Sequence, residues 1–274
     1  MSELAPWLGV SRGVAPLIVS MPHTGTDIPA ELEHRFVSAW SARKDADFWV
    51  HRLYDFAPEL GATTIRTTLS RSIIDMNRDP SGISLYPGQH TTGLCPTTTF
   101  DGEPLYKEGK APDDDEIARR RSQIFEPYHA ALRAEIDRLR KTHPTIVLFE
   151  AHSIRSRIPR LFEGELPNVN IGTNSGVACA LALANAIEQI CDSLGFGRVT
   201  DGRFKGGYTT RHYGRPAHGV HAVQLELAMR GYMGEPELPT PENWPSRYDP
   251  NRAAPLRTLL RTILETCLDF TSTS

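Results

Sequence analysis

The chain has few cysteines and no long apolar run, and these gaps exclude several classes of protein. Only 4 of its 274 residues are cysteine, and none falls in CxxC spacing, so neither a disulfide framework nor a cysteine-based zinc site is predicted. No apolar run approaches the roughly 20 residues that cross a bilayer. The N-terminal MSELAPWLGVSRGVAP also lacks the basic-then-apolar pattern of a secretion signal. We therefore expect reduced thiols and a cytoplasmic protein with no membrane partner.

Strong charge of one sign and the common catalytic signatures are absent as well. The formal net charge of -3 is too small to argue for a nucleic-acid partner. The HExxH, P-loop, GxSxG and GxGxxG patterns do not occur, so no single motif assigns a function. Hydrophobic content of 39% and charged content of 23% are ordinary for a globular protein.

Apolar runs rich in Val, Ile and Leu alternate with helical patterns over most of the chain. Strands are expected near residues 15–21, 62–69, 145–150, 168–171, 205–209 and 219–227, and helices over 30–39, from 45 onward, 114–141, 175–194 and 255–270. This alternation predicts one α/β domain over residues 1–274, with three α/β/α layers around a mostly parallel, mixed sheet. The Gly-, Pro- and Thr-rich segment 79–111 is expected to form an ordered lid.

Two histidines each follow the pattern of a buried strand, His23 in PLIVSMPHTG and His152 in TIVLFEAHS. Side chains just past the carboxyl ends of parallel strands project into the crevice where open α/β sheets bind ligands. Imidazole is a common zinc ligand; the alternative is a histidine that only caps a strand. Glu150 shares a strand face with His152 and is expected to orient it. Glu226, inside the apolar VHAVQLELA, suits a general base, unless an arginine simply pairs with it.

A third acid and several arginines complete the set of candidates. The segment DADFWV offers Asp45 and Asp47, and one of the two is expected to cap a helix, which leaves the other free. Arginine presents a planar fork that matches a carboxylate, so dense arginine segments favour anion binding over mutual pairing of charges. The residues in such segments are Arg71, Asn77, Arg78, Arg155 and Arg211.

Taken together, six segments resemble the N-formylglutamate amidohydrolase family, in the right order from about Pro16 to Met233. They are SMPHTGTDIP, DADFWVHRLY, SRSIIDMNRDPSG, LFEAHSIRS, GYTTRHYGRP and HAVQLELAMRGYM. The family is similar in layout to zinc carboxypeptidases and to succinylglutamate desuccinylase and aspartoacylase, in which a ligand His, an acidic ligand, Arg, an Asn-Arg pair, a second ligand His and a catalytic Glu follow one another. The matching residues here are His23, Arg71, Asn77, Arg78, His152 and Glu226.

One departure concerns the acidic ligand. The carboxypeptidase pattern has it three residues after the first histidine, where this chain has Thr26. The acid must then come from another segment, and Asp47 is preferred to Asp45.

The resemblance implies hydrolysis of N-formyl-L-glutamate to L-glutamate and formate, a step of histidine degradation. His23, Asp47 and His152 would hold one Zn²⁺, with Mn²⁺ and Co²⁺ as alternatives, and Glu226 would be the general base. Arginine would share the charge on the formyl oxygen, and Arg71 is the candidate. The substrate is a small dicarboxylate. Arg71, Asn77 and Arg78 would bind one carboxylate and Arg155 or Arg211 the other, with Tyr213 closing the site.

Two alternatives stay open at this point. The first is a related zinc hydrolase that acts on another N-acyl amino acid or on a C-terminal peptide bond. The second is a carboxylate-binding protein that keeps the fold but not the metal. The sequence leaves the oligomeric state undetermined.

Overall fold

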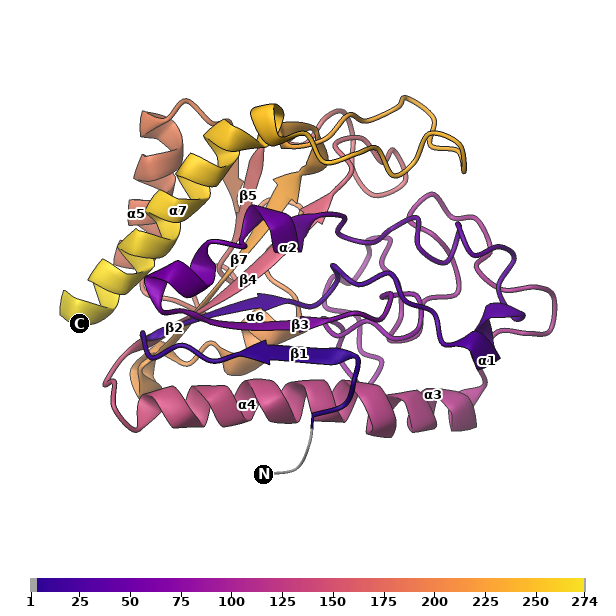
Figure 1. Ribbon diagram of the computed structural model, residues 1–274, viewed down its shortest axis with the longest axis horizontal. Helices are drawn as coiled ribbons and strands as arrows, with labels where there is room; N and C mark the ends of the chain where they lie inside the picture. The colour runs from indigo at the N-terminus through magenta and orange to yellow at the C-terminus, as the bar shows by residue number, and fades with distance from the viewer. Residues whose placement is uncertain (1–3, 274) are drawn as a thin grey trace.

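The computed structural model describes residues 4–273 and is built around one central sheet (Figure 1). The strands are β1 Leu8–Ser11, β2 Leu17–Met21, β3 Thr63–Thr67, β4 Ile146–Ile154, β5 Val169–Gly172, β6 Arg198–Thr200 and β7 Val220–Ala228. Their order across the sheet is β1-β3-β2-β4-β7-β5-β6. The central β3, β2, β4 and β7 are parallel, whereas β1 and β5 run antiparallel to β3 and β7. The predicted α/β class with a mixed, mainly parallel sheet is confirmed.

Helices lie on both faces of this sheet. They are α1 Ala30–Glu33, α2 Val50–Leu53, α3 Asp114–Arg120, α4 Glu126–Arg140, α5 Leu181–Ser193, α6 Tyr208–Tyr213 and α7 Pro250–Thr273, with 3₁₀ turns at Ala57–Leu60, Pro216–His218 and Met229–Gly231. A π-helical turn, Arg121–Phe125, joins α3 to α4 into the long helix predicted from the sequence. No helix within residues 4–273 is both long and apolar enough to span a bilayer.

Side-chain alternation along the strands builds a core on each face. Leu17 and Val19 of β2 pack in the cluster that contains residues of α5 and α7, whereas Ile18 packs with Tyr128 and Leu132 of α4. Successive residues of a strand point to opposite faces, so a strand that is apolar throughout needs cover on both sides. In Figure 1 the α3–α4 helix lies along one side of the sheet and α5 and α7 along the other.

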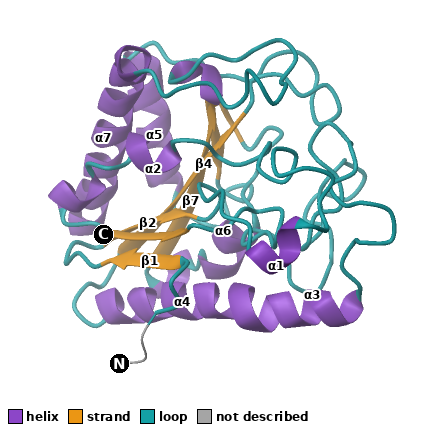
Figure 2. Cartoon of the chain, turned by 45° about the vertical axis from the view of Figure 1, so that its right-hand side comes forward, coloured by secondary structure: helices purple, strands orange, loops and turns teal. Residues whose placement is uncertain are grey.

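Loops gather on the side toward which the central strands run (Figure 2). The long connection between β3 and α3, all of it described, contains no helix or strand of its own. Isolated backbone bridges nevertheless fix its second half, between Phe36 and Tyr106 and between Thr98 and Pro104. These bridges show ordered backbone pairing in the segment, whereas its role as a lid stays a prediction.

Three local predictions are wrong, and a long-range contact explains the first of them. The helix expected over residues 30–39 ends at Glu33, because Phe36 pairs with Tyr106 through a bridge and a ring contact at 4.5 Å. The strand expected at 205–209 is instead a loop that leads into α6 at Tyr208, since Gly206 adopts a φ of 102° and β6 lies earlier. The helix expected from residue 175 starts later, after Asn174 and Ser175 at φ 55° and 57°.

One further strand and one strand boundary also differ from expectation. The edge strand β1 was not predicted, because its Leu8–Ser11 is short and pairs only with β3. Strand β4 continues to Ile154, so His152 lies within the strand instead of just past it. This extension matters for the site, because it places His152 opposite Glu226 in the parallel pairing of β4 with β7.

Candidate metal centre and active site

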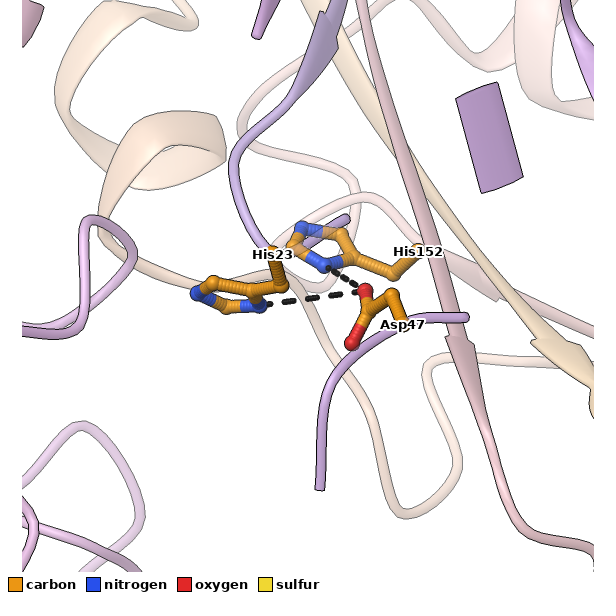
Figure 3. A group of neighbouring side chains, drawn as sticks. All are labelled: His23, Asp47 and His152. Atoms are coloured by element: carbon orange, nitrogen blue, oxygen red, sulfur yellow. Dashed lines mark hydrogen bonds and ion pairs between the residues drawn. The ribbon is translucent and has the colours of Figure 1, made fainter. Parts of the chain in front are cut away.

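Three buried side chains, His23, Asp47 and His152, converge at the carboxyl side of the sheet (Figure 3). One ligand atom from each lies within 4.8 Å of the others. Oδ2 of Asp47 is 3.0 Å from Nδ1 of His152 and 3.8 Å from Nδ1 of His23. The structure therefore brings together the three residues that the sequence predicted as metal ligands.

The donor set of these three residues fits a divalent metal ion. Nδ1 of His23 and Oδ1 of Asp47 are buried without a hydrogen-bond partner among residues 4–273, which is costly unless a ligand satisfies them. The opposite ring nitrogens face carboxylates, with Nε2 of His23 2.7 Å from Asp75 and Nε2 of His152 3.6 Å from Glu150. Carboxylates behind metal-binding imidazoles orient the rings and raise their basicity. Imidazole and carboxylate oxygen suit Zn²⁺, Mn²⁺ and Co²⁺ alike.

Backbone contacts hold Asp47 beside the two histidines. Its main-chain N–H donates to the carbonyl of His23 at 2.9 Å. Its Oδ2 accepts from the main-chain N–H of Ser153 at 3.2 Å, one residue past His152 on β4. The carboxylate is thus fixed against two strand ends and has little freedom to turn away.

Asp45 neither joins the cluster nor caps a helix. Its Oδ2 accepts from the main-chain N–H of Phe100 at 2.6 Å, and its Oδ1 lies 3.5 Å from the guanidinium of Arg155. Helix α2 starts at Val50, with Trp49 as the residue before it. The expected capping role is wrong, because this carboxylate instead links the loop around Phe100 to Arg155, the residue after β4.

The buried charges shift pKa values in opposite directions. Burial disfavours the protonated form of His152, but hydrogen bonds to Asp47 and Glu150 outweigh it and raise the pKa of this histidine to about 10. Burial likewise acts against ionisation of Asp75, yet the charge of Arg71 keeps its pKa well below the usual range. The cluster therefore holds fixed negative charge around its two imidazoles.

Glu226 is the acid beside this cluster. Burial raises the pKa of Glu226 to about 8, with the charge of His152 acting in the opposite direction. It shares a strand face with Gln224, whose Oε1 accepts from the main-chain N–H of Gly207 at 2.8 Å. A carboxylate with a raised pKa that lines a cavity is well suited to accept and return a proton.

One cavity opens onto these groups, and two walls enclose it. The sheet wall is formed by His23, His152, Gln224 and Glu226. The loop wall is formed by Arg71, Asn77, Arg78, Tyr86, Arg203 and Phe204. The predicted base and two of the three predicted metal ligands thus share one cavity with Arg71, Asn77 and Arg78.

Arg71 and Asn77 link the loop wall to the cluster. Nη2 of Arg71 donates to Asp75 at 2.6 Å, its Nη1 is 3.6 Å from Oδ1 of Asp47, and its guanidinium lies 4.8 Å from the ring of Phe100. Nδ2 of Asn77 is 3.1 Å from Nε2 of His152. Both side chains are therefore anchored at the edge of the proposed reaction centre.

Three residues predicted to bind substrate lie outside the cavity lining. Arg155 donates to Asp101 at 2.7 Å. Arg211 donates through Nε to a main-chain carbonyl of the neighbouring loop at 2.8 Å. Tyr213 is buried, with its hydroxyl 3.1 Å from Nδ1 of His129. The structure assigns their polar groups to other parts of the protein, so none of the three is brought to the cavity.

Two charged residues of the site, Asp75 and Arg203, were not predicted. Asp75 belongs to the segment RSIIDMNRDP, and its position two residues before Asn77 in a dense polar run is a signal that could have indicated it. Arg203 occurs in DGRFKGG, where no strand-end or motif signal marks it. Its place in the cavity depends on loops that only the fold brings together.

An α/β fold with a buried His–Asp–His group and a nearby high-pKa carboxylate at its strand ends is typical of metal-dependent hydrolases. The sequence model of the N-formylglutamate amidohydrolase family matches residues 15–233. N-formylglutamate deformylases from Pseudomonas putida and Pseudomonas aeruginosa are each 44% identical over 262 residues, which cover 95% of this chain and 95% and 96% of theirs. The chain therefore belongs to the N-formylglutamate amidohydrolase family, and the resemblance drawn from its six segments is confirmed.

Solved structures share the fold. A crystal structure of N-formylglutamate amidohydrolase from Ralstonia eutropha superimposes with a TM-score of 0.77 at 22% identity and covers 97% of both chains. A gene product from Agrobacterium tumefaciens gives 0.72 at 17% identity, over 97% of this chain and 96% of that one. At these identities the likeness supports the architecture alone.

Proposed function

We propose that this protein hydrolyses N-formyl-L-glutamate to L-glutamate and formate, with a divalent metal ion held by His23, Asp47 and His152. Family membership and the two deformylases at 44% identity support the substrate. The observation that supports a metal ion is the buried His–Asp–His group, in which two donor atoms have no hydrogen-bond partner among residues 4–273. Zn²⁺ is the preferred ion, with Mn²⁺ and Co²⁺ as alternatives.

Glu226 is the proposed general base. When bound, the metal would supply a Lewis acid that polarises the formyl oxygen and lowers the pKa of water. Glu226 accepts the proton of the attacking water and passes it to the nitrogen of the departing glutamate. Its pKa of about 8 suits both directions of this transfer near neutral pH.

Arg71 and the neighbouring Asn77 and Arg78 are proposed to position the substrate. Arg71 carries its positive charge 3.6 Å from Asp47, where it stabilises negative charge that develops on the formyl oxygen. Asn77 and Arg78 are proposed to bind the α-carboxylate, which is attached to the same carbon as the formamide nitrogen. The formyl group is small, so most of the binding energy must come from the glutamate half.

Formate release is the direct test. Purified protein is incubated with N-formyl-, N-acetyl- and N-succinyl-L-glutamate, before and after treatment with a chelator, and its metal content is measured. We expect release of L-glutamate, the product common to all three substrates, from N-formyl-L-glutamate alone, with one formate for each glutamate. Activity should be lost with the chelator and recovered on adding Zn²⁺, Mn²⁺ or Co²⁺. Absence of formate release by metal-loaded protein would contradict the function, and full activity of metal-free protein would contradict the metal.

A reducing compartment is also proposed. The four cysteines, Cys95, Cys179, Cys191 and Cys267, are buried free thiols. Proteins of oxidising compartments usually pair their cysteines, so this pattern supports a cytoplasmic location.

A further inference from the structure

Arg203 differs from the other arginines of the loop wall in having no acidic partner. Its Nε donates to the carbonyl of Leu161 at 2.8 Å, and its Nη2 donates to the carbonyl of His90 at 2.8 Å. Nη1 has no hydrogen bond, and no carboxylate within residues 4–273 forms an ion pair with this guanidinium. Glu226 acts on it only through longer-range charge. One edge of a partly buried cation is therefore left for a ligand.

The two other arginines of the wall lack this freedom. Arg71 forms an ion pair with Asp75 at 2.6 Å. All three nitrogen atoms of the Arg78 guanidinium have acceptors within the protein, on Asn77 and Thr92, and its Nε lies 3.8 Å from Asp75. Their positive charge is already partly balanced, whereas that of Arg203 is not. A partly buried charge without a counter-charge carries a desolvation cost, so a negative ligand group would lower that cost at Arg203.

The guanidinium is also held in place before any ligand binds. It lies 5.4 Å from the ring of Tyr86 and 5.3 Å from the ring of Phe204. The hydroxyl of Tyr86 is fixed in turn, since it donates to the carbonyl of Gly206 at 2.9 Å. Burial lowers the pKa of Arg203, but an arginine keeps its proton at any physiological pH. A cation fixed by two carbonyls and two rings loses little entropy on binding a carboxylate.

We propose that Arg203 binds the side-chain carboxylate of the substrate and is the residue that selects glutamate. This inference rests on the proposed function. The α-carboxylate must stay near the scissile bond, and Asn77, 3.1 Å from His152, lies there together with Arg78. The contacts of Arg203 are with Tyr86, His90, Leu161 and Phe204, and none of these is a ligand residue. This separation from the ligand residues suits the carboxylate at the far end of the glutamate side chain.

The test compares substrates that differ in one carboxylate. Rates of formate release are measured for N-formyl-L-glutamate, N-formyl-L-glutamine and N-formyl-L-isoglutamine with the metal-loaded wild type and Arg203→Met. A charge-assisted contact predicts that Arg203→Met lowers kcat/KM about 10- to 100-fold for N-formyl-L-glutamate and for N-formyl-L-isoglutamine, which keeps the side-chain carboxylate. The loss should be under about threefold for N-formyl-L-glutamine, which lacks that charge.

Arg211→Met is the matched control, because Arg211 lies 5.1 Å from the same Tyr86 ring but does not line the cavity. Any loss in this control should be equal for all three substrates. An equal loss of kcat/KM for all three substrates in Arg203→Met would mean that Arg203 has a structural role. A loss only for the substrates that carry the α-carboxylate would assign Arg203 to that carboxylate. Either result overturns the proposal. Should Arg203→Met not fold, Arg203→Lys must keep part of the preference for glutamate over glutamine. Lack of formate release by the wild type would instead contradict the proposed function.

Discussion

The sheet wall and the loop wall of the cavity use polar residues in different ways. On the sheet wall, His152 and Glu226 occupy opposed positions of paired strands, and acids such as Asp75 and Glu150 stand behind the imidazoles. On the loop wall, Arg78 and Arg203 come from distant segments and are fixed mainly by main-chain carbonyls and a threonine hydroxyl. Rigid strands position reacting atoms closely, whereas loops can supply cations that recognise a substrate. The difference suggests chemistry on one wall and recognition on the other.

The largest effect is expected at the sheet wall, from Glu226→Gln. Glutamine keeps the size of the side chain but cannot accept a proton, so kcat should fall about 10²- to 10⁴-fold, while KM changes little. Steady-state formate release measures both values, and metal content and melting temperature should match those of the wild type. A variant that keeps kcat within tenfold would remove Glu226 from the role of base and weaken the division between the walls.

Substitutions on the loop wall are expected to raise KM more than they lower kcat. Arg78→Ala removes a cation without touching the ligand cluster, so we expect KM to rise about 10- to 100-fold with kcat largely kept. Arg198→Ala is a suitable control, because that arginine forms its hydrogen bonds with Asp192 at 2.9 and 2.8 Å and does not line the cavity. If Arg78→Ala lowered kcat and left KM unchanged, the loop wall would take part in the chemistry and the comparison would fail.

The sheet wall of the cavity could be predicted from the sequence to a larger extent than the loop wall. The central strands are continuous apolar runs, because both faces are buried, and His23 and Glu226 were recognisable from their places in or after such runs. The choice of Asp47 needed the family resemblance as well, since Asp45 has the same local setting and only the fold shows it turned toward Arg155.

The loop wall could not be predicted because its geometry is set by contacts between distant segments. Arg203 enters the cavity only where carbonyls of Leu161 and His90 meet it. Arg155 has the same side chain but forms an ion pair with Asp101. The local sequence shows that each of these residues is an arginine. Whether an acidic residue pairs with that arginine depends on the tertiary structure.

The smallest expected effect is on the free energy of unfolding. It compares a buried histidine of the sheet wall, His152, with a buried histidine away from the cavity, His129. His129 is buried like His152, but within the described residues 4–273 no carboxylate forms a hydrogen bond with it. Its ring lies 2.9 Å from the carbonyl of Met76 and 3.1 Å from the hydroxyl of Tyr213. Burial lowers the pKa of His129 to about 4, whereas the pKa of His152 is raised to about 10.

The sign of the resulting pH dependence follows from proton uptake. Between about pH 6.5 and 4 the unfolded chain binds a proton at His129 that the folded protein does not, so acidification favours unfolding. From pH 7 to pH 5 this site should cost at most about 2 kcal/mol of the free energy of unfolding. Urea unfolding of the wild type and of His129→Gln at pH 7 and pH 5 gives the free energy of unfolding at each pH. The loss of this free energy from pH 7 to pH 5 should be smaller in the variant. An equal loss in the two proteins would mean that folding does not lower the pKa of His129. A buried histidine in this protein would then keep its proton without a carboxylate partner.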